Sequence, residues 1–172
     1  RTCLVGSEMC IRDSGTTDHY VASVKGSVLK YNPNNKIVDI SHEVNKYDLS
    51  HAAYIFKNIY EEFPQGSVHI IGVNNSDDDN KIILFQLNNQ YVITFDSGII
   101  SLLDSKENIS VIEIEGEKHS SFPEKLMGEV ASKIASGINY TTLGKPISEF
   151  KQFSNVEVKI TNNEICLLYT SP

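Results

Sequence analysis

The stretch SVHIIGV at residues 67–73 decides the fold, because it is almost continuously apolar. A strand with this pattern is buried on both faces, and such strands are typical of parallel sheets. Pro64 and Gly66 lie directly before it and end a segment, residues 48–63, whose apolar side chains fall on one helical face. The pattern predicts a helix that leads into a central, buried strand.

The same alternation of helix and strand continues on both sides. Residues 36–41, KIVDIS, are short and β-branched and predict a strand, whereas residues 18–31 place apolar side chains at helical spacing. Further on, the asparagines at 88–89 separate two apolar runs as a hairpin turn would, and residues 126–137 predict a helix closed by a glycine. We therefore expect an α/β domain in Rossmann-like layers: a mostly parallel sheet with a local antiparallel pair and helices on both faces.

Composition limits the possible partners. The net charge of -7 and the pI near 5.2 disfavour nucleic acid, whose phosphate backbone attracts basic proteins. No apolar run approaches the roughly 20 residues that span a bilayer, so we expect no membrane segment. All three cysteines, Cys3, Cys10 and Cys166, lie near the ends. A body without cysteine offers no disulfide framework and no thiolate metal site, which fits the cytoplasm.

The two ends differ from the rest of the chain. LVGSEMCIRDS at residues 4–14 and CLLYTSP at 166–172 resemble translated sequencing adapters rather than evolved protein. We therefore expect residues 1–12 and 166–172 to be non-native and to stay out of the core, with the domain spanning residues 13–165. A short strand formed by the N-terminal stretch is an open alternative, because the genuine first strand would have occupied that place.

The predicted loops indicate where a ligand would bind. Open parallel sheets bind ligands outside the carboxyl ends of their strands. Loops follow four likely strands, and we expect them to converge on one crevice: residues 13–18, 41–47, 74–81 and 95–98. The first loop also resembles an ordinary helix start, since Thr and Asp are common N-cap residues.

Four blocks of sequence, in this order and spacing, resemble one family: GTTDHYVASVKGSVLKYNP, KIVDISHEV, AAYIFKNIYEEFPQGSVHIIGV and FDSGIISLL. They are similar to the N-terminal domain of the S-adenosylmethionine hydroxide adenosyltransferases, or SAM hydrolases, which share a fold with fluorinases and chlorinases. The resemblance covers essentially residues 13–165. It implies that water attacks the ribose C5′ of S-adenosylmethionine and expels methionine, with the substrate itself as the only small molecule and no further cofactor or metal.

The resemblance also implies an assembly. A β-rich C-terminal domain would follow and is missing from this sequence. Sites in the family lie between the N-terminal domain of one subunit and the C-terminal domain of its neighbour in a homotrimer. This chain alone would then hold half of a site and be inactive.

Residues that bind the substrate follow by similarity. Asp13 would hold the ribose hydroxyls and Asp18 the methionine ammonium, because carboxylates suit both groups. Tyr47 would line the ribose and adenine side, although a Tyr before a helix is also a common hydrophobic staple. Asp96 and Ser97 fall in FDSG, a loop that usually reads Asp-Asn-Gly in the family. Asp96 is either a substrate ligand or the cap of the next helix.

The residues that activate the nucleophile differ from the family pattern of Asp, Arg and His. Asn74 stands at the Asp position, Lys81 or Asn80 stands near the Arg position, and Phe122 or Pro123 replaces the His. An Asn is no carboxylate base. Two functions stay open: a hydrolase with a differently activated nucleophile, and a non-catalytic module that binds S-adenosylmethionine or adenosine.

Two further features have simpler interpretations. His42 in DISHEV matches a family position, and we interpret it as a hydrogen-bonded structural residue rather than a base. The three aspartates at residues 77–79 are consecutive and cannot all face one ion, so they predict a solvated acidic turn and no metal site.

Overall fold

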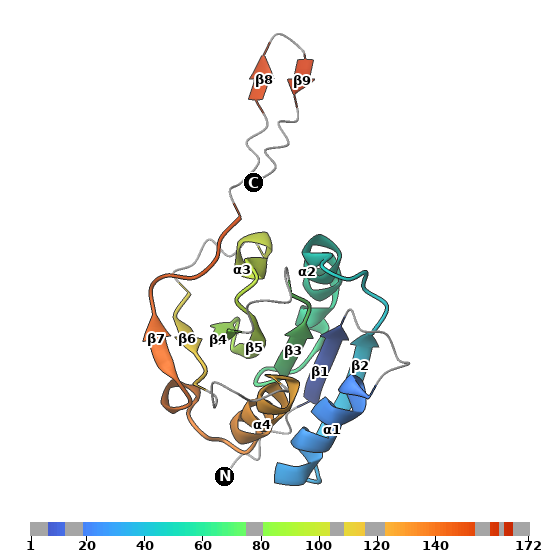
Figure 1. Cartoon of the computed structure of the whole chain (residues 1–172), viewed down its shortest axis with the longest axis vertical. Helices are drawn as coiled ribbons and strands as arrows, with labels where there is room; N and C mark the ends of the chain where they lie inside the picture. Colours follow the sequence, from blue (N-terminus) through green and yellow to red (C-terminus); the bar gives the residue numbers. More distant parts are fainter. Residues whose placement is uncertain are drawn as a thin grey trace.

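The computed structural model describes residues 7–12, 19–74, 81–103, 109–115, 123–153, 159–161 and 164–166 of the 172-residue chain. In this part, a seven-stranded mixed sheet carries helices on both faces (Figure 1). Its strands are β1 (Ser7–Arg12), β2 (Lys36–Ser41), β3 (Val68–Gly72), β4 (Ile82–Leu87), β5 (Gln90–Phe95), β6 (Val111–Glu113) and β7 (Lys145–Ile147). The α-helices are α1 (Tyr20–Tyr31), α2 (Leu49–Ile59), α3 (Ile99–Leu102) and α4 (Pro123–Ala135). Two 3-10 turns, η1 (Tyr60–Glu62) and η2 (Tyr140–Thr142), and a separate hairpin, β8 (Lys159–Thr161) with β9 (Glu164–Cys166), complete the described elements.

The sheet has a parallel half and an antiparallel half, in the order β2-β1-β3-β5-β4-β6-β7. The pairings β1–β2, β1–β3 and β3–β5 are parallel, and the pairings β4–β5, β4–β6 and β6–β7 are antiparallel. The predicted α/β class, the hairpin and the helices on both faces are confirmed. The expectation of a mostly parallel sheet is wrong, because the strands after β4 extend the hairpin antiparallel. Strand periodicity does not reveal the direction of a partner.

The N-terminal segment needs a second correction. Residues 7–12 form β1, which lies between β2 and β3 and pairs with both, with Cys10 opposite Asp39 on one side and Ile70 on the other. The expectation that residues 1–12 stay out of the core is therefore wrong for residues 7–12, and the alternative of a short N-terminal strand is confirmed. That the segment is non-native stays a prediction. Without β1, the facing edges of β2 and β3 would leave backbone N–H and C=O groups unpaired.

Two hydrophobic clusters fill the spaces between sheet and helices. Ile71 of β3 packs with Phe56 of α2 and Ile99 of α3 on one face, and its neighbour Ile70 packs with Met127 of α4 on the other. Consecutive residues of a strand point to opposite faces, so a strand buried on both faces must be apolar throughout. All five residues of β3 are buried, as predicted.

Helices α1 and α4 lie side by side on the same face of the sheet (Figure 1). Gly128 of α4 permits their close approach, because a Cβ at this position would lie 2.7 Å from the backbone oxygen of Val24 in α1. From the middle of α1, the Lys25 side chain reaches Asp39 of β2.

One edge of the sheet collects the ends of several strands. The parallel strands β1, β2, β3 and β5 all end at this edge, which we call the carboxyl edge. Strand β4 runs in the opposite direction and begins there, since Ile82 pairs with Phe95. The loops predicted to converge therefore do follow strands that end at a common edge. No helix in the described ranges is long and apolar enough to cross a membrane.

Candidate functional site

Four of the predicted site residues lie in loops at the carboxyl edge, and a fifth, Lys81, lies directly before β4. Asn74 comes just after β3, Asp96 and Ser97 follow β5, and Tyr47 lies between β2 and α2. Asp13 and Asp18 lie outside the described residues.

Asp96 and Lys81 lie together at this edge. The Lys81 Nζ is 3.7 Å from Asp96 Oδ2 and 3.3 Å from Glu113 Oε2, and the Asp96 backbone N–H donates to the Lys81 carbonyl oxygen at 2.8 Å. The backbone N–H of Lys151 donates to Asp96 Oδ1, also at 2.8 Å. Asp96 is buried, so its carboxylate connects β4, β5 and the segment around Lys151. Both of its oxygens already face protein groups.

Ser97 and Gly98 form a tight turn into α3. The Ser97 N–H donates to the Phe95 carbonyl oxygen at 2.8 Å, and Gly98 has φ 92°, a left-handed conformation that favours glycine. Gly98, not Asp96, is the N-cap residue of α3, so the alternative role of Asp96 as a helix cap is not observed. The Ser97 Oγ is fully buried and makes no hydrogen bond with the described part of the chain.

A later segment covers this turn. A Cβ at Gly98 would lie 2.8 Å from the ring of Phe153, and the Phe153 N–H donates to Ser101 Oγ at 3.1 Å. Together with the Lys151 contact, residues 151–153 therefore form one wall over the loop after β5. Local sequence gave no signal for this wall, because its partners lie about fifty residues away.

Tyr47 has an unusual backbone. Its φ is 66°, which is rare for a bulky side chain and costs energy that the surrounding structure must offset. The next residue, Asp48, caps α2 by accepting from the His51 N–H at 2.9 Å, and Val44 anchors the loop in the core. The Tyr47 ring is 40% exposed and belongs to neither hydrophobic cluster. The Lys46 Nζ lies 4.8 Å from its centroid.

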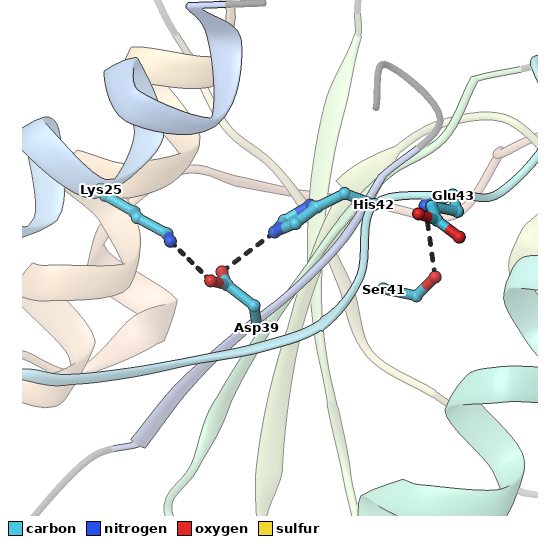
Figure 2. A network of polar contacts seen from close by, with 5 residues as sticks. All are labelled: Lys25, Asp39, Ser41, His42 and Glu43. Carbon is cyan, nitrogen blue, oxygen red and sulfur yellow. Dashed lines mark hydrogen bonds and ion pairs between the residues drawn. The ribbon is translucent and has the colours of Figure 1, made fainter. Parts of the chain in front are cut away.

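A polar network at the end of β2 joins His42, Asp39 and Lys25 (Figure 2). The His42 Nε2 lies 3.0 Å from Asp39 Oδ1, and the Lys25 Nζ donates to Asp39 Oδ2 at 2.6 Å. Partial burial raises the pKa of the Asp39 carboxyl, but the contacts with Lys25 and His42 outweigh burial and hold its pKa below the usual value. Asp39 is therefore a carboxylate at neutral pH.

His42 is only 7% exposed, which its place after a strand did not predict. Neither ring nitrogen makes a hydrogen bond of good geometry with the described residues, although Nε2 is at ion-pair distance from Asp39. The interpretation of His42 as a hydrogen-bonded structural residue stays a prediction, with Asp39 as its polar partner among the described residues. The spacing of an Asp and a His three residues apart at a strand end was the available signal.

The described residues at this edge offer no set of donors that suits a metal ion. The part of the chain that the structure describes contains no group of three or more His, Cys, Asp or Glu side chains placed to hold one. Lys81, a cation, occupies the space beside Asp96 and Glu113 instead. The three aspartates at residues 77–79 lie outside the described residues.

Comparison of the sequence with protein-family models shows the family of the chain. Residues 10–144 match the family model of the SAM hydroxide adenosyltransferase N-terminal domain. The chain belongs to this family. The matched region begins inside β1 and ends directly before β7. Membership agrees with the four sequence blocks on which the resemblance was based.

Two curated relatives of this SAM hydroxide adenosyltransferase domain give it a context. An (R)-S-adenosyl-L-methionine hydrolase of Methanocaldococcus jannaschii is 31% identical over 114 residues, which cover 62% of this chain and 43% of the relative. A fluorinase of an Actinoplanes species is 38% identical over 56 residues, covering 33% of this chain and 19% of that enzyme. The chain thus spans less than half the length of either curated relative.

Solved structures agree on the fold of the domain. An uncharacterised conserved protein from Thermotoga maritima has a TM-score of 0.75 and 21% identity, over 91% of this chain and 63% of that one. A conserved hypothetical protein from Thermus thermophilus has a TM-score of 0.69 and 22% identity, over 83% of this chain and 58% of that one. At these identities the likeness concerns the fold.

Proposed function

We propose that this domain binds S-adenosylmethionine at the carboxyl edge of its sheet and, within the full-length protein, transfers the adenosyl group to water, giving adenosine and methionine. The observation that carries this proposal is the family match over residues 10–144, together with the hydrolase among its relatives. The position of Tyr47, Asn74, Lys81 and Asp96 around one sheet edge supports it.

The chemistry requires little help for the leaving group. The substrate sulfonium departs as a neutral thioether, so catalysis depends on positioning the substrate and on activating the attacking water. In this proposal Asp13 holds the ribose hydroxyls, Asp18 holds the ammonium, and Tyr47 offers its ring to the adenosyl group. The strained backbone of Tyr47 supports a functional role, because such strain is concentrated at ligand sites.

The roles of three further residues follow from their contacts. Ser97 has a buried hydroxyl without a partner in the described part of the chain, which suits a hydrogen bond to substrate. Asp96 would act through its contacts with Lys81 and Lys151, by fixing the loop that carries Ser97. Lys81 would supply positive charge at the family's Arg position.

A second candidate function is a module that binds S-adenosylmethionine or adenosine without turnover. Asn74 at the family's Asp position favours it, since a carboxamide accepts no proton from water. The remaining parts of the proposal are a β-rich C-terminal domain and a homotrimer in which neighbouring subunits complete each site. Light scattering of the product of the complete gene tests the trimer.

Calorimetric titration with S-adenosylmethionine and an adenosine-release assay test the function, using the protein expressed from the complete gene. We expect Asp18→Ala to weaken binding by about 2–5 kcal/mol if the pair with the ammonium is buried, and Asp18→Asn to separate charge from shape. Asn74→Asp alone should recover little activity, because residues that act as a unit are not additive. Rapid hydrolysis by the wild type would exclude the non-catalytic module. Unchanged affinity in Asp18→Ala would remove the proposed ammonium site.

A further inference from the structure

The proposed reaction needs a group that takes a proton from water, and few groups at the carboxyl edge qualify. Among the described residues there, Asp96 already faces Lys151 and Lys81, Asp48 caps α2, and Asn74 has no basic atom. Glu43 is exposed to solvent. Glu113 pairs with Lys81, so His42 is the candidate that remains among the described residues at this edge.

The surroundings of His42 are those of an oriented base. The ring is buried, its Nε2 faces the Asp39 carboxylate at 3.0 Å, and Asp39 is held in turn by Lys25 at 2.6 Å (Figure 2). A carboxylate beside Nε2 favours the tautomer with its proton on Nε2, which leaves the lone pair on Nδ1. The Nδ1 is buried and has no hydrogen-bond partner in the described ranges. Leaving such a group unsatisfied is costly, so its presence calls for a functional explanation.

We propose that His42 is the general base of the adenosyl transfer and accepts the proton of the attacking water at Nδ1, with Asp39 and Lys25 as positioning residues. This inference rests on the proposed function. It would explain how a site with Asn74 at the family's Asp position activates its nucleophile. It also uses a side chain that the family's activating set does not include.

The step balances without another reactant. The water oxygen forms a bond to the ribose C5′, the bond from C5′ to the sulfonium sulfur breaks, and its electron pair stays on sulfur as the thioether of methionine. The proton leaves the water oxygen for His42 Nδ1, and the protonated imidazole is stabilised by Asp39. Release of this proton to solvent restores the base.

His42 lies at the carboxyl edge, beside the strand that precedes the proposed ribose ligand. Strand β2 lies beside β1, with Ser41 opposite Ile11, so His42 lies level with the end of β1. The proposed ribose ligand, Asp13, follows β1 directly in the sequence. Neighbouring strands are about 5 Å apart, so His42, which directly follows β2, is one strand away from the strand that leads into this ligand.

Two substitutions separate a catalytic role from a structural one. In His42→Gln the side-chain amide reaches the Nε2 position and keeps a donor to Asp39, but the Nδ1 position is empty. In His42→Asn the amide occupies the Nδ1 position and the contact with Asp39 is lost. If His42 is the base, both variants of the full-length protein should lose about 10²–10⁴-fold in kcat with little change in KM. Only His42→Asn should lower the melting temperature.

A structural role gives the opposite pattern, and this pattern would overturn the inference: His42→Gln would keep wild-type kcat while His42→Asn lost activity along with stability. An independent readout is the ¹⁵N chemical shift of the imidazole in the chain itself. We expect the wild-type His42 ring to carry its proton on Nε2. In Asp39→Asn we expect a mixture of the two tautomers. A proton found on Nδ1 would overturn the assignment, because that atom would have no lone pair to offer.

Failure of the inference can be told from failure of the proposed function. If the wild type releases adenosine and His42→Gln does so equally well, His42 is not the base, but the proposed function stands. If the wild type binds S-adenosylmethionine without releasing adenosine, His42 is not a catalytic base and the non-catalytic binding module is favoured. If the wild type neither binds nor releases adenosine, both the role of His42 and the proposed function are wrong.

Discussion

His69 lies in an environment that disfavours its charged form. It is buried in β3, with the rings of Phe56 and Phe63 facing it edge-on at 5.1 and 6.3 Å between centroids. Burial lowers the pKa of His69 to about 4, against the opposing effect of the hydrogen bond between its Nε2 and Gln90 Oε1 at 2.6 Å. Gln90 in turn donates to backbone oxygens of Tyr60 and Phe63. This histidine is structural and neutral.

We predict that His69 makes the domain sensitive to acid. Because the folded pKa lies below the usual 6.5, the unfolded chain takes up a proton first as the pH falls. The full stability is present above pH 6.5 and is lost progressively toward pH 4. Between pH 7.5 and 5.0 the loss from this group should be about 2 kcal/mol in urea unfolding. His69→Gln keeps a polar partner for Gln90 and should lose less; an equal loss in both proteins would contradict the prediction.

A second prediction concerns Tyr47. Because its backbone is left-handed, a substitution there can weaken binding without lowering stability. Asparagine tolerates this conformation better than tyrosine, so Tyr47→Asn should leave the unfolding free energy unchanged or raise it by about 1 kcal/mol. The same variant should bind S-adenosylmethionine at least about tenfold more weakly, since the aromatic face is lost. Tyr54, 67% exposed on α2, provides the control: Tyr54→Ala should change neither quantity. Unchanged affinity in Tyr47→Asn would place this ring outside the site.

At the scale of the elements, the contact between the loop after β5 and the segment at residues 151–153 depends on Gly98. Gly98→Ala should cost more than about 2 kcal/mol of unfolding free energy, because it combines backbone strain at φ 92° with a clash against Phe153. In a Phe153→Ala background the same change should cost about 1–3 kcal/mol less, which a double-mutant cycle measures. Gly26→Ala, at an open position in α1, should instead stabilise by about 1 kcal/mol. Equal costs of Gly98→Ala in both backgrounds would show that Phe153 does not press on this turn.

Elements with a strong repeat were predictable from sequence, and the others were not. The helix after residue 48, strand β3 and the Asn88-Asn89 hairpin each carry a clear pattern; both asparagines adopt positive φ, as a tight hairpin turn requires. Strands β6 and β7 have three residues each, too few to show a period, and they add two antiparallel pairings to the predicted hairpin. Strand β1 was predictable only as an alternative, because the composition of residues 1–12 disfavours a native strand and only the pairing with both β2 and β3 shows its place.

The candidate site was predictable in outline. Strand ends indicated the loops, and the structure places Asn74, Asp96 and Tyr47 in them and brings Lys81 to Asp96. The partners of these residues could not be predicted from local sequence, because Lys151, for example, is 55 positions from Asp96. Contacts of this kind depend on the pairing order of the sheet, which local patterns do not contain.

For the whole molecule, the place of β1 is the feature most open to a direct test. Proline cannot donate to a sheet ladder, and it is rarely tolerated in a strand that pairs on both sides. Cys10 lies in the middle of β1, opposite Asp39 and Ile70, so Cys10→Pro should lower the unfolding free energy by about 3 kcal/mol or more or prevent folding. Cys10→Val keeps the backbone donor and should melt near the wild type in circular dichroism. Equal melting of both variants would show that this segment lies outside the sheet.

The central place of β1 also bears on synthesis at the ribosome. This strand leaves the exit tunnel before either of its neighbours, and its second partner is complete only when Gly72 has been translated. Until then its backbone has no lateral partner on that side, and unpaired strands of nascent chains are prone to association. The β1–β3 pairing therefore forms only after β3 has emerged, and the parallel half of the sheet is complete only after β5 has followed.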